Sequence, residues 1–506
     1  MKQIVNRPRV SISVEGSELS ADDLRALGEV RVKQVLGLPA QCELAFRETA
    51  GPLTAASRLG PGSNFQVSIQ GLSGTLFRGQ TTAVEQVYDA SHGREMRVRG
   101  YDVLHRLRKR QSVRAHVEVT AASLAEELVK DVGIFVHADH PGPTYHQVIQ
   151  HRQSDLELLT DVAARCGLYA TLWDETLHLT TLEGMGDAVG LVLGDTLFEV
   201  RVEVNGDPAC RTVKTIGWDP LRDETHRGEV STARSGRSIS AEVAPSQVGG
   251  NGTREFPDEA AQDDQHAEGL AQAELDLRAA REVTLAAIAE GDPRLRPGAR
   301  VEIKGVADSI AGRYVLTEVT HTIDEQGGYV SEIGSTPPAP RPRSQNAMAA
   351  PGVVTRVDDP DHKGRIKVSL PTYADLETEW LGVLSAGAGA GKGLMTLPDV
   401  GDHVLVLFAH GNPSEGMVLG GLYGIQGPPD PGVEGTAVRR YTLLTPAGLK
   451  IQLDDTKKTI RLSDPKGSYF EIAPNKVRVH AAVDLDLEAP GHSIKIRGKS
   501  IDFQTG

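Results

Sequence analysis

Residues 353–423 decide the fold: they begin with VVTRVDDPDHKGRIKVSLP, continue through Trp380 and LPDVGDHVLVLF (397–408), and end with GNP (411–413) and VLGGLY (418–423). Val353 and Val357 mark a first strand, and apolar residues alternate with polar ones over 364–370. Further strands are expected at 380–384, 401–408 and 417–423. About five strands in roughly 70 residues, with glycine at the turns, are typical of a small closed barrel of the OB type.

After this barrel, apolar residues recur as pairs separated by one residue, at steps of seven to ten residues. Each unit therefore predicts one short strand and one turn. A single ribbon has no second layer over its apolar face, and no helix is expected after the barrel, so we expect other chains to cover it. Three ribbons wound into a triangular β-prism would place on the axis Ile451, Leu453, Ile460, Leu462, Phe470, Ile472, Val477, Val479, Leu485, Leu487, Ile494, Ile496, Ile501 and Phe503.

The region before the barrel predicts a mixed α+β structure that is mostly strand. Alternating runs at 65–69, 75–77, 97–99, 296–305 and 312–323 predict strands. Capping boxes at Ser123 and Ser154 predict two helices, of which the second ends at Gly167. A third helix is expected over 264–288, and the polar stretch 221–265 is expected to be a long loop.

Two stretches rich in proline and glycine divide the chain. We expect a hub domain at 1–333, a linker at 334–350, an OB-fold barrel at 351–424, a second linker at 425–438 and a needle at 439–506. The predicted fold class is mainly β with some helix.

Composition excludes a general polyanion binder. The 506 residues carry a net charge of −14, and aromatic residues make up only 4%. Residues 351–416 hold five basic against nine acidic residues, whereas a barrel that binds single strands needs positive charge and stacking aromatics. No nucleic-acid partner is expected.

No segment predicts export or a membrane span. The N-terminus lacks the apolar region of a signal peptide, and the tightest apolar run covers only residues 404–409. We therefore expect synthesis and assembly in the cytoplasm without a signal peptide. Cys42, Cys166 and Cys210 are far apart, so three ordinary reduced cysteines are expected.

No sequence motif for nucleotide binding, metal binding or catalysis is complete in this chain. The run SAGAGAGKGL (385–394) resembles a phosphate loop, but Ala386 and Gly393 replace the glycine and the magnesium-binding hydroxyl that the motif requires. The sixteen histidines, His480 and His492 among them, show no spacing typical of metal ligands. Nothing in the sequence marks a pair of carboxylates as catalytic. We expect no catalytic, cofactor-binding or metal-binding residue and no cofactor. A basic run is expected to be a solvated face or a contact to an acidic partner subunit: Arg106, Arg108, Lys109, Arg110 and Arg114.

Several segments resemble those of the VgrG and contractile-tail baseplate-spike family. RPGARVEIKGV (296–306), GRYVLTEVTHTI (312–323) and SDLELL (154–159) resemble its hub region, and residues 353–423 resemble its OB module. The resemblance covers nearly the whole chain and is most specific in the OB block.

This resemblance implies a homotrimer with a mechanical function. The hub would contain two related β-barrels per subunit and present a near-sixfold ring to the hexameric inner tube protein. The barrels would form a collar, and the β-prism needle would carry a PAAR-repeat tip protein at Ile501, Phe503 and Gly506. Baseplate proteins and, in some members, cargo effectors are the other partners, and the target membrane is contacted only mechanically, when sheath contraction drives the spike through the envelope.

Two departures from the family narrow the expectation. Residues 424–438 are too short for the lysozyme domain that some phage members carry, and the needle ends without a further domain. The short needle favours a phage-tail-like extracellular injection particle over a type VI secretion VgrG or a phage tail spike. We expect the protein to be part of an injection particle that is extracellular or released on lysis. A tail-associated peptidoglycan hydrolase is the alternative from the enzyme class.

Overall fold

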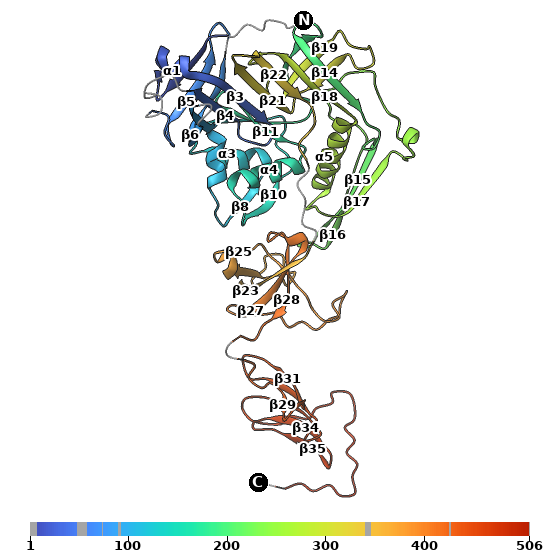
Figure 1. Cartoon of the computed structure of the whole chain (residues 1–506). Coiled ribbons are helices and arrows are strands. Elements are labelled where there is room, and N and C mark those ends of the chain that lie inside the picture. The colour runs from blue at the N-terminus through green and yellow to red at the C-terminus, as the bar shows by residue number, and fades with distance from the viewer. Residues whose placement is uncertain are drawn as a thin grey trace. The chain divides into compact units, whose positions relative to one another are not determined.

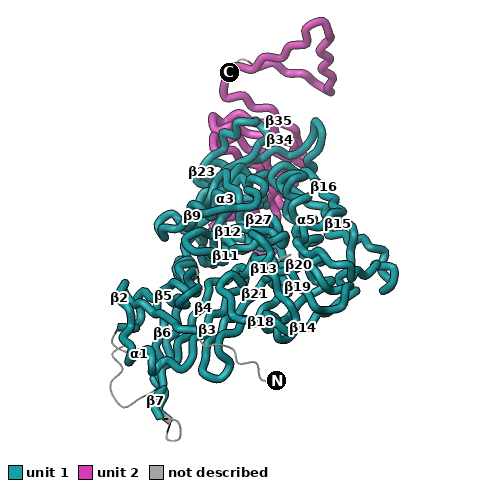
Figure 2. The backbone as a smooth tube through the Cα atoms, turned by 90° about the horizontal axis from the view of Figure 1, so that it is seen from above, with its two compact units in different colours: residues 1–421 teal, residues 422–506 magenta. Residues whose placement is uncertain are grey.

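The computed structural model describes residues 8–47, 58–72, 74–89, 93–339, 346–424 and 427–504. The chain forms two compact units, residues 1–421 and 422–506 (Figure 2). Strands outnumber helices in both units (Figure 1). Within the described ranges, no helix is long and apolar enough to cross a membrane.

One 11-stranded sheet runs through the first unit, in the order β14-β18-β22-β21-β3-β4-β7-β6-β5-β1-β2. Its first half packs around a core that includes Ile12, Leu44, Phe46 and Met96, with the short helix α1 (Ala21–Ala26) beside it. The strands of this half are β1 (Val10–Val14), β2 (Ser17–Glu18), β3 (Leu27–Val35), β4 (Gln41–Arg47), β5 (Asn64–Ile69), β6 (Thr75–Asp89) and β7 (Gly93–Tyr101).

The second half packs around a separate core that includes Leu285, Val301 and Tyr314. Its strands are β14 (Leu197–Val204), β18 (Val283–Glu290), β21 (Glu318–Asp324) and β22 (Gly328–Gly334). A separate three-stranded sheet contributes to the same core, with β13 (Met185–Val192), β19 (Ala299–Lys304) and β20 (Gly312–Val315). Strands β21 and β3 pair antiparallel and join the halves. This arrangement confirms the predicted fold class, mainly β with some helix.

A smaller α+β region follows the first half, with α3 (Ala121–Val129) and α4 (Asp155–Arg165) in one apolar core. Its other elements are η1 (Val103–Lys109), β8 (Arg114–Val119), β9 (Phe135–Ala138), β10 (Tyr145–Gln150), β11 (Tyr169–Trp173) and β12 (Thr176–Thr180). The capping box at Ser154 is confirmed, because its hydroxyl accepts from the Glu157 N–H and the Glu157 carboxylate accepts from the Ser154 N–H. The N-cap of α3 is Thr120 rather than the predicted Ser123, which is the third residue of the helix and closes the capping box.

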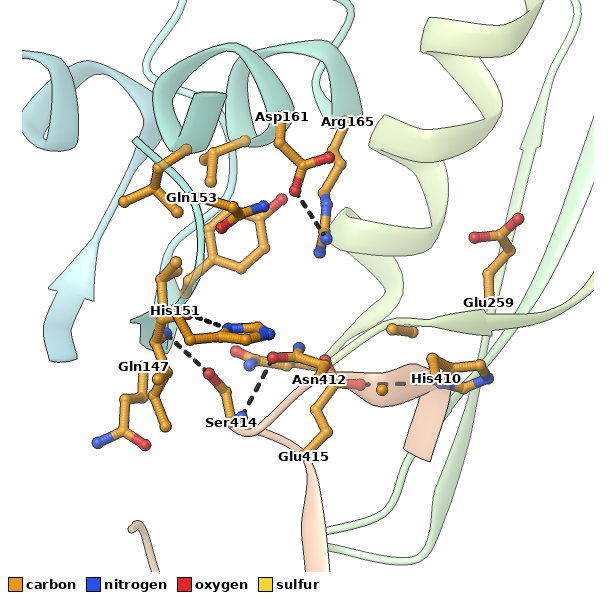
Figure 3. Close-up of a pocket in the computed structure, with 18 of the residues that line it drawn as sticks. Gln147, His151, Gln153, Asp161, Arg165, Glu259, His410, Asn412, Ser414 and Glu415 are labelled. Carbon is orange, nitrogen blue, oxygen red and sulfur yellow. Dashed lines mark hydrogen bonds and ion pairs between the residues drawn. The ribbon is translucent and has the colours of Figure 1, made fainter. Parts of the chain in front are cut away.

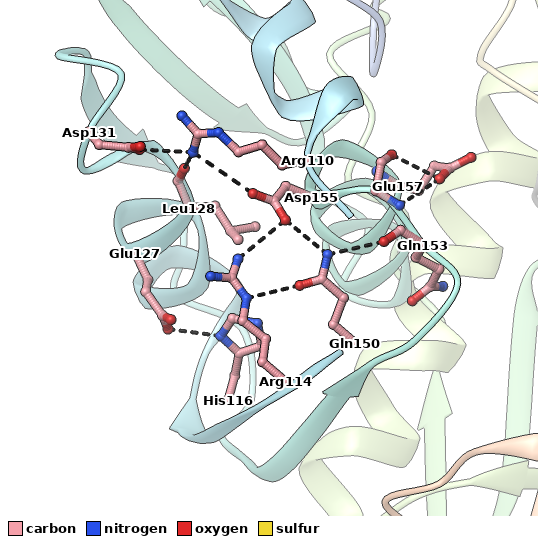
Figure 4. A network of polar contacts seen from close by, with 11 residues as sticks. Arg110, Arg114, His116, Glu127, Leu128, Asp131, Gln150, Gln153, Asp155 and Glu157 are labelled. Carbon is pink, nitrogen blue, oxygen red and sulfur yellow. Dashed lines mark hydrogen bonds and ion pairs between the residues drawn. The ribbon is translucent and has the colours of Figure 1, made fainter. Parts of the chain in front are cut away.

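The basic run is only partly a solvated face. Asp155, at the start of α4, is buried and lies 3.2 Å from the guanidinium of Arg114 and 2.9 Å from the amide nitrogen of Gln150 (Figure 4). Arg110 pairs with Asp131 at 2.8 Å, and Arg108 stacks over Tyr101. Two of the predicted surface cations, Arg114 and Arg110, therefore lie beside the buried Asp155 carboxylate, which needs such partners.

The stretch 221–265 is not the long loop that its polarity predicts. It contains β16 (Glu224–Val230), the 3-10 helix η2 (Pro245–Val248) and β17 (Thr253–Ala260). Strands β16 and β17 form a three-stranded sheet with β15 (Thr212–Asp219), beside helix α5 (Asp264–Glu282). The long helix also ends earlier than predicted, because residues 283–290 form β18. Pairing of β18 with β14 on one side and with β22 on the other overrides the helical preference of its alanine and leucine residues.

The predicted OB-type barrel is present. Its elements are β23 (Met348–Arg356), β24 (Lys367–Leu370), η3 (Pro371–Tyr373), β25 (Leu376–Glu377), β26 (Gly382–Val383), β27 (His403–Phe408), η4 (Ala409–Gly411) and β28 (Gly416–Gly421). Mutual backbone hydrogen bonds between Ile366 and Leu381 close the sheet. Strand β23 begins inside the segment predicted as a linker, and the glycine-rich run 385–394 is an exposed loop after β26.

The second unit is a meander of short strands. A small hairpin of β29 (Val433–Glu434) and β30 (Ala437–Val438) lies within the segment predicted as a linker. Five antiparallel strands follow in chain order: β31 (Arg440–Leu444), β32 (Lys450–Asp454), β33 (Thr459–Ser463), β34 (Tyr469–Ala473) and β35 (Lys476–His480).

Candidate functional site: the apolar face of the C-terminal ribbon

The predicted apolar pairs lie side by side in the ribbon of strands β31–β35. Ile451 is opposite Leu462, and Leu453 is opposite Ile460, across β32 and β33. The next strands continue the two rows, with Phe470 opposite Leu462 and Val479 opposite Phe470. Because side chains alternate along a strand, this register places all four pairs on one face of the sheet.

Burial in this ribbon is inverted relative to an ordinary sheet. Ile460 and Leu462 are 43% and 42% exposed, and Val477 is 63% exposed. The polar residues between and beside them, such as Arg461 and Glu471, are half-buried. An apolar face left in water while the polar face is better covered indicates a surface that is completed by another protein layer.

Side-chain contacts hold the polar face in order. Arg461 pairs with Glu471 at 3.2 Å and lies over the ring of Tyr469, whose hydroxyl accepts from Arg478 at 3.1 Å. At the start of the ribbon, two hydrogen bonds from Arg440 hold the pKa of Asp430 below its usual range. These contacts fix the sheet that presents the apolar rows.

The other three predicted pairs lie in residues 481–504, where the structure has no strand. They are exposed, and their place on a trimer axis stays a prediction: Leu485, Leu487, Ile494, Ile496, Ile501 and Phe503. Gly506, predicted to contact a tip protein, lies outside the described residues. Sequence reasoning missed one pair of the face, Tyr441 and Leu443, which lie opposite Leu453 and Ile451. Their spacing of two, one step of ten residues before the next pair, is the signal that identifies them.

One serine–histidine pair resembles a catalytic arrangement but is inaccessible. The Nδ1 atom of His321 lies 2.9 Å from the Ser331 hydroxyl, and its Nε2 atom lies 2.9 Å from the carbonyl oxygen of Leu295. Both residues are buried in the second half of the hub sheet, so this pair is structural. Cys42, Cys166 and Cys210 are free and also buried. Among the described residues, no group of three or more His, Cys, Asp or Glu side chains is placed to hold a metal ion.

The buried histidine makes hub stability depend on pH. Burial lowers the pKa of His321 from 6.5 to about 4, so between these values the unfolded chain binds a proton that the folded chain excludes. The contribution of this residue to the free energy of unfolding is fully present above pH 6.5. It falls by about 3 kcal/mol as the pH decreases toward 4. Urea unfolding across this range should show that His321→Gln has a flatter pH dependence than the unchanged protein. Equal slopes would contradict a neutral, buried imidazole.

Comparison with known proteins identifies the class. A family model described as the type VI secretion system/phage-baseplate injector OB domain matches residues 350–423. Two Vibrio cholerae proteins, the type VI secretion system spike protein VgrG3 and the actin cross-linking toxin VgrG1, are each 23% identical over 63% of this chain. The chain spans only about a third of their length, 35% and 32% respectively.

Two solved structures share the fold. One is an Escherichia coli component of the type VI secretion system with structural similarity to the T4 bacteriophage tail proteins gp27 and gp5; its TM-score is 0.53 at 13% identity, with 81% of this chain and 99% of that chain covered. The other is a Francisella PdpA–VgrG complex, with a TM-score of 0.54 at 9% identity and coverage of 95% and 81%.

In its fold and its OB domain the chain is similar to spikes of the VgrG and contractile-tail baseplate class, which confirms the resemblance found in the sequence. A second family model, described as the Alg8 N-terminal domain, matches residues 10–325, more than half of the chain, and the chain belongs to that family.

Proposed function

We propose that this chain forms the homotrimeric spike of a contractile injection machine, in which it connects the inner tube to the puncturing tip. The observation that carries the proposal is the uncovered apolar face of β31–β35, because two further copies of the same ribbon would bury it. Threefold closure satisfies every copy equally, as closed symmetric assemblies require.

Each part has a role in this proposal. Residues 1–333 form the hub that receives the hexameric inner tube, the OB barrel forms a collar, and residues 439–506 form the needle that carries a PAAR-repeat tip protein. Assembly takes place in the cytoplasm, and sheath contraction drives the spike through the target envelope. We further propose that the machine is a phage-tail-like extracellular injection particle, with a type VI system or a phage tail as the alternatives.

The proposed role is mechanical. Spike proteins are the matched relatives, and the toxin named among them is matched over only 32% of its length. The activity that its name describes is therefore not transferred to this chain. Baseplate proteins are the partner class that the relatives support.

The native mass tests the trimer directly. Light scattering or native mass spectrometry at micromolar concentration should give a single species of three times 54.2 kDa. Burying a large apolar side chain contributes about 1.5–3 kcal/mol, and each ribbon presents ten of them on β31–β35. A monodisperse species of one chain mass would overturn the proposal.

Tip capture tests the end of the needle. Ile496→Asp would place three carboxylates on a dry axis in the trimer, so capture of a PAAR-repeat tip protein should weaken at least tenfold, that is, by about 1.4 kcal/mol or more. Lys495→Asp, one residue earlier and expected on the outer face, should capture the tip as well as the unchanged chain. A pulldown in which both variants fail equally would refute the assigned strand register.

A further inference from the structure

A cleft runs along helix α4 in the first unit. One part, of about 690 Å³, lies between the β3–β4 turn, α4, β17 and α5, and its lining includes Leu38, Phe256 and Leu277. A second part, of about 290 Å³, is lined by α4, β10, β17 and the turn before β28. Asp161, Arg165 and Glu259 line both parts, so we treat them as one α4–α5 cleft. Figure 3 shows Asp161 and Arg165 projecting from α4, with Glu259 on the strand across from them.

The walls of the α4–α5 cleft are apolar at one end and acidic along its length. Leu38 is 52% exposed at its mouth, and Phe256 is half-buried in its wall. Four carboxylates line the two parts, Asp161, Glu259, Glu274 and Glu415, against one guanidinium, that of Arg165. Arg165 is bound to Asp161 at 3.0 Å, and Glu274 is bound to Arg278 at 2.7 Å. Carboxylates therefore outnumber guanidinium groups among the side chains that line the cleft, beside exposed apolar surface.

Buried polar atoms in the cleft lack partners. Among the described atoms, the Nε of Arg165 and the Oε1 of Gln147 are buried and make no hydrogen bond, and Gln147 is itself 6% exposed. Desolvated polar groups of this kind are costly unless a ligand or water meets them. Pro338 and Ala339 of this chain already lie at the larger part, and the carbonyl oxygen of Pro338 accepts from Arg281. An extended peptide backbone is therefore compatible with the cleft.

We propose that the α4–α5 cleft is a docking site for a short extended segment of a partner protein that carries basic and aliphatic side chains. The aliphatic side chains would cover Leu38 and Phe256, and a lysine or arginine would meet the acidic lining near Glu259. A backbone segment offers both the carbonyl oxygen and the N–H that the unpartnered atoms of Arg165 and Gln147 require. Charge complementarity selects this occupant over an acidic peptide.

Peptide binding to the full-length protein tests the proposal independently of the oligomeric state. The probe is fluorescein-labelled Lys-Leu-Leu-Lys-Leu, measured by anisotropy, with Glu-Leu-Leu-Glu-Leu and Lys-Ser-Ser-Lys-Ser as matched peptides. We expect saturable binding of the first and binding about tenfold weaker or more for the other two. Leu38→Ser and Glu259→Gln should each weaken binding of the first peptide several-fold. Glu203→Gln, on the exposed strand β14, is the matched control and should leave binding unchanged.

Several results would overturn the site. They are equal binding of the acidic peptide, no saturable binding, and binding that neither cleft variant alters. Hydrogen exchange tests one further alternative, in which a neighbouring copy of the chain fills the cleft. If added peptide does not increase the protection of residues 36–38 and 160–165, a partner segment is rejected as the occupant. Each of these outcomes leaves the native mass, and with it the trimer, unaffected.

Discussion

Replacing Ile460 by aspartate is expected to dissociate the ribbon of the trimer. Ile460 lies in the middle of the apolar face, between Leu453 and Ile472 on the neighbouring strands. In the trimer, one substitution removes three buried side chains, worth about 4–9 kcal/mol in total, and adds three unpaired carboxylates to a dry interface. The midpoint concentration of assembly, measured by mass photometry or sedimentation, should rise at least a thousandfold.

Ser463→Asp is the matched control on the same strand. Ser463 lies on the polar face opposite Lys450, so the new carboxylate gains a partner across the strands. Assembly of this variant should match that of the unchanged chain within about twofold. If both variants assemble normally, the apolar face is not the trimer contact, and if both fail, the alternation of the two faces is wrong.

The ribbon could be predicted from sequence because its signal is local. A period of two in the apolar residues predicts both the strand and which of its faces is apolar. The register of β32–β35 then follows from the turns. Helix α4 was predictable for the same reason, since Ser154 and Glu157 cap it within four residues. The apolar pattern of the ribbon does not show which residues cover its apolar face, because in the proposed trimer those residues belong to other chains.

The failures occurred where pairing with distant segments decides the structure. Strand β18 is rich in alanine, and only its place between β14 and β22 makes it a strand. Strands β16 and β17 are polar, and their pairing with β15 beside α5 has no local signature. A Cβ atom at Gly228 would approach the backbone of Ala267 to 2.4 Å, so β16 and α5 are in close contact there. No local feature of the sequence predicts this contact. The α4–α5 cleft was equally hidden, because its walls come from segments more than a hundred residues apart.

Arg234 belongs to the same misjudged stretch, and its removal is expected to destabilise the hub strongly. Its backbone N–H and its Nε both donate to the Asp276 carboxylate, at 2.6 and 2.8 Å, and its terminal nitrogen donates to the carbonyl oxygen of Cys166 at 3.2 Å. Asp276 is buried in α5, and burial raises its pKa. The guanidinium thus ties the segment after β16 to both α4 and α5.

Arg234→Ala leaves the Asp276 carboxylate buried without its cation, which costs about 3–5 kcal/mol of unfolding free energy. Arg234→Lys retains the charge but not the planar fork, so its loss should be intermediate. Arg201→Ala, on the exposed face of β14, should change stability by less than about 0.5 kcal/mol. Urea unfolding followed by circular dichroism measures all three. If Arg234→Ala proved as mild as Arg201→Ala, the stretch 231–237 would be a loosely attached loop, as its composition suggests, rather than a buried connection between the two helices.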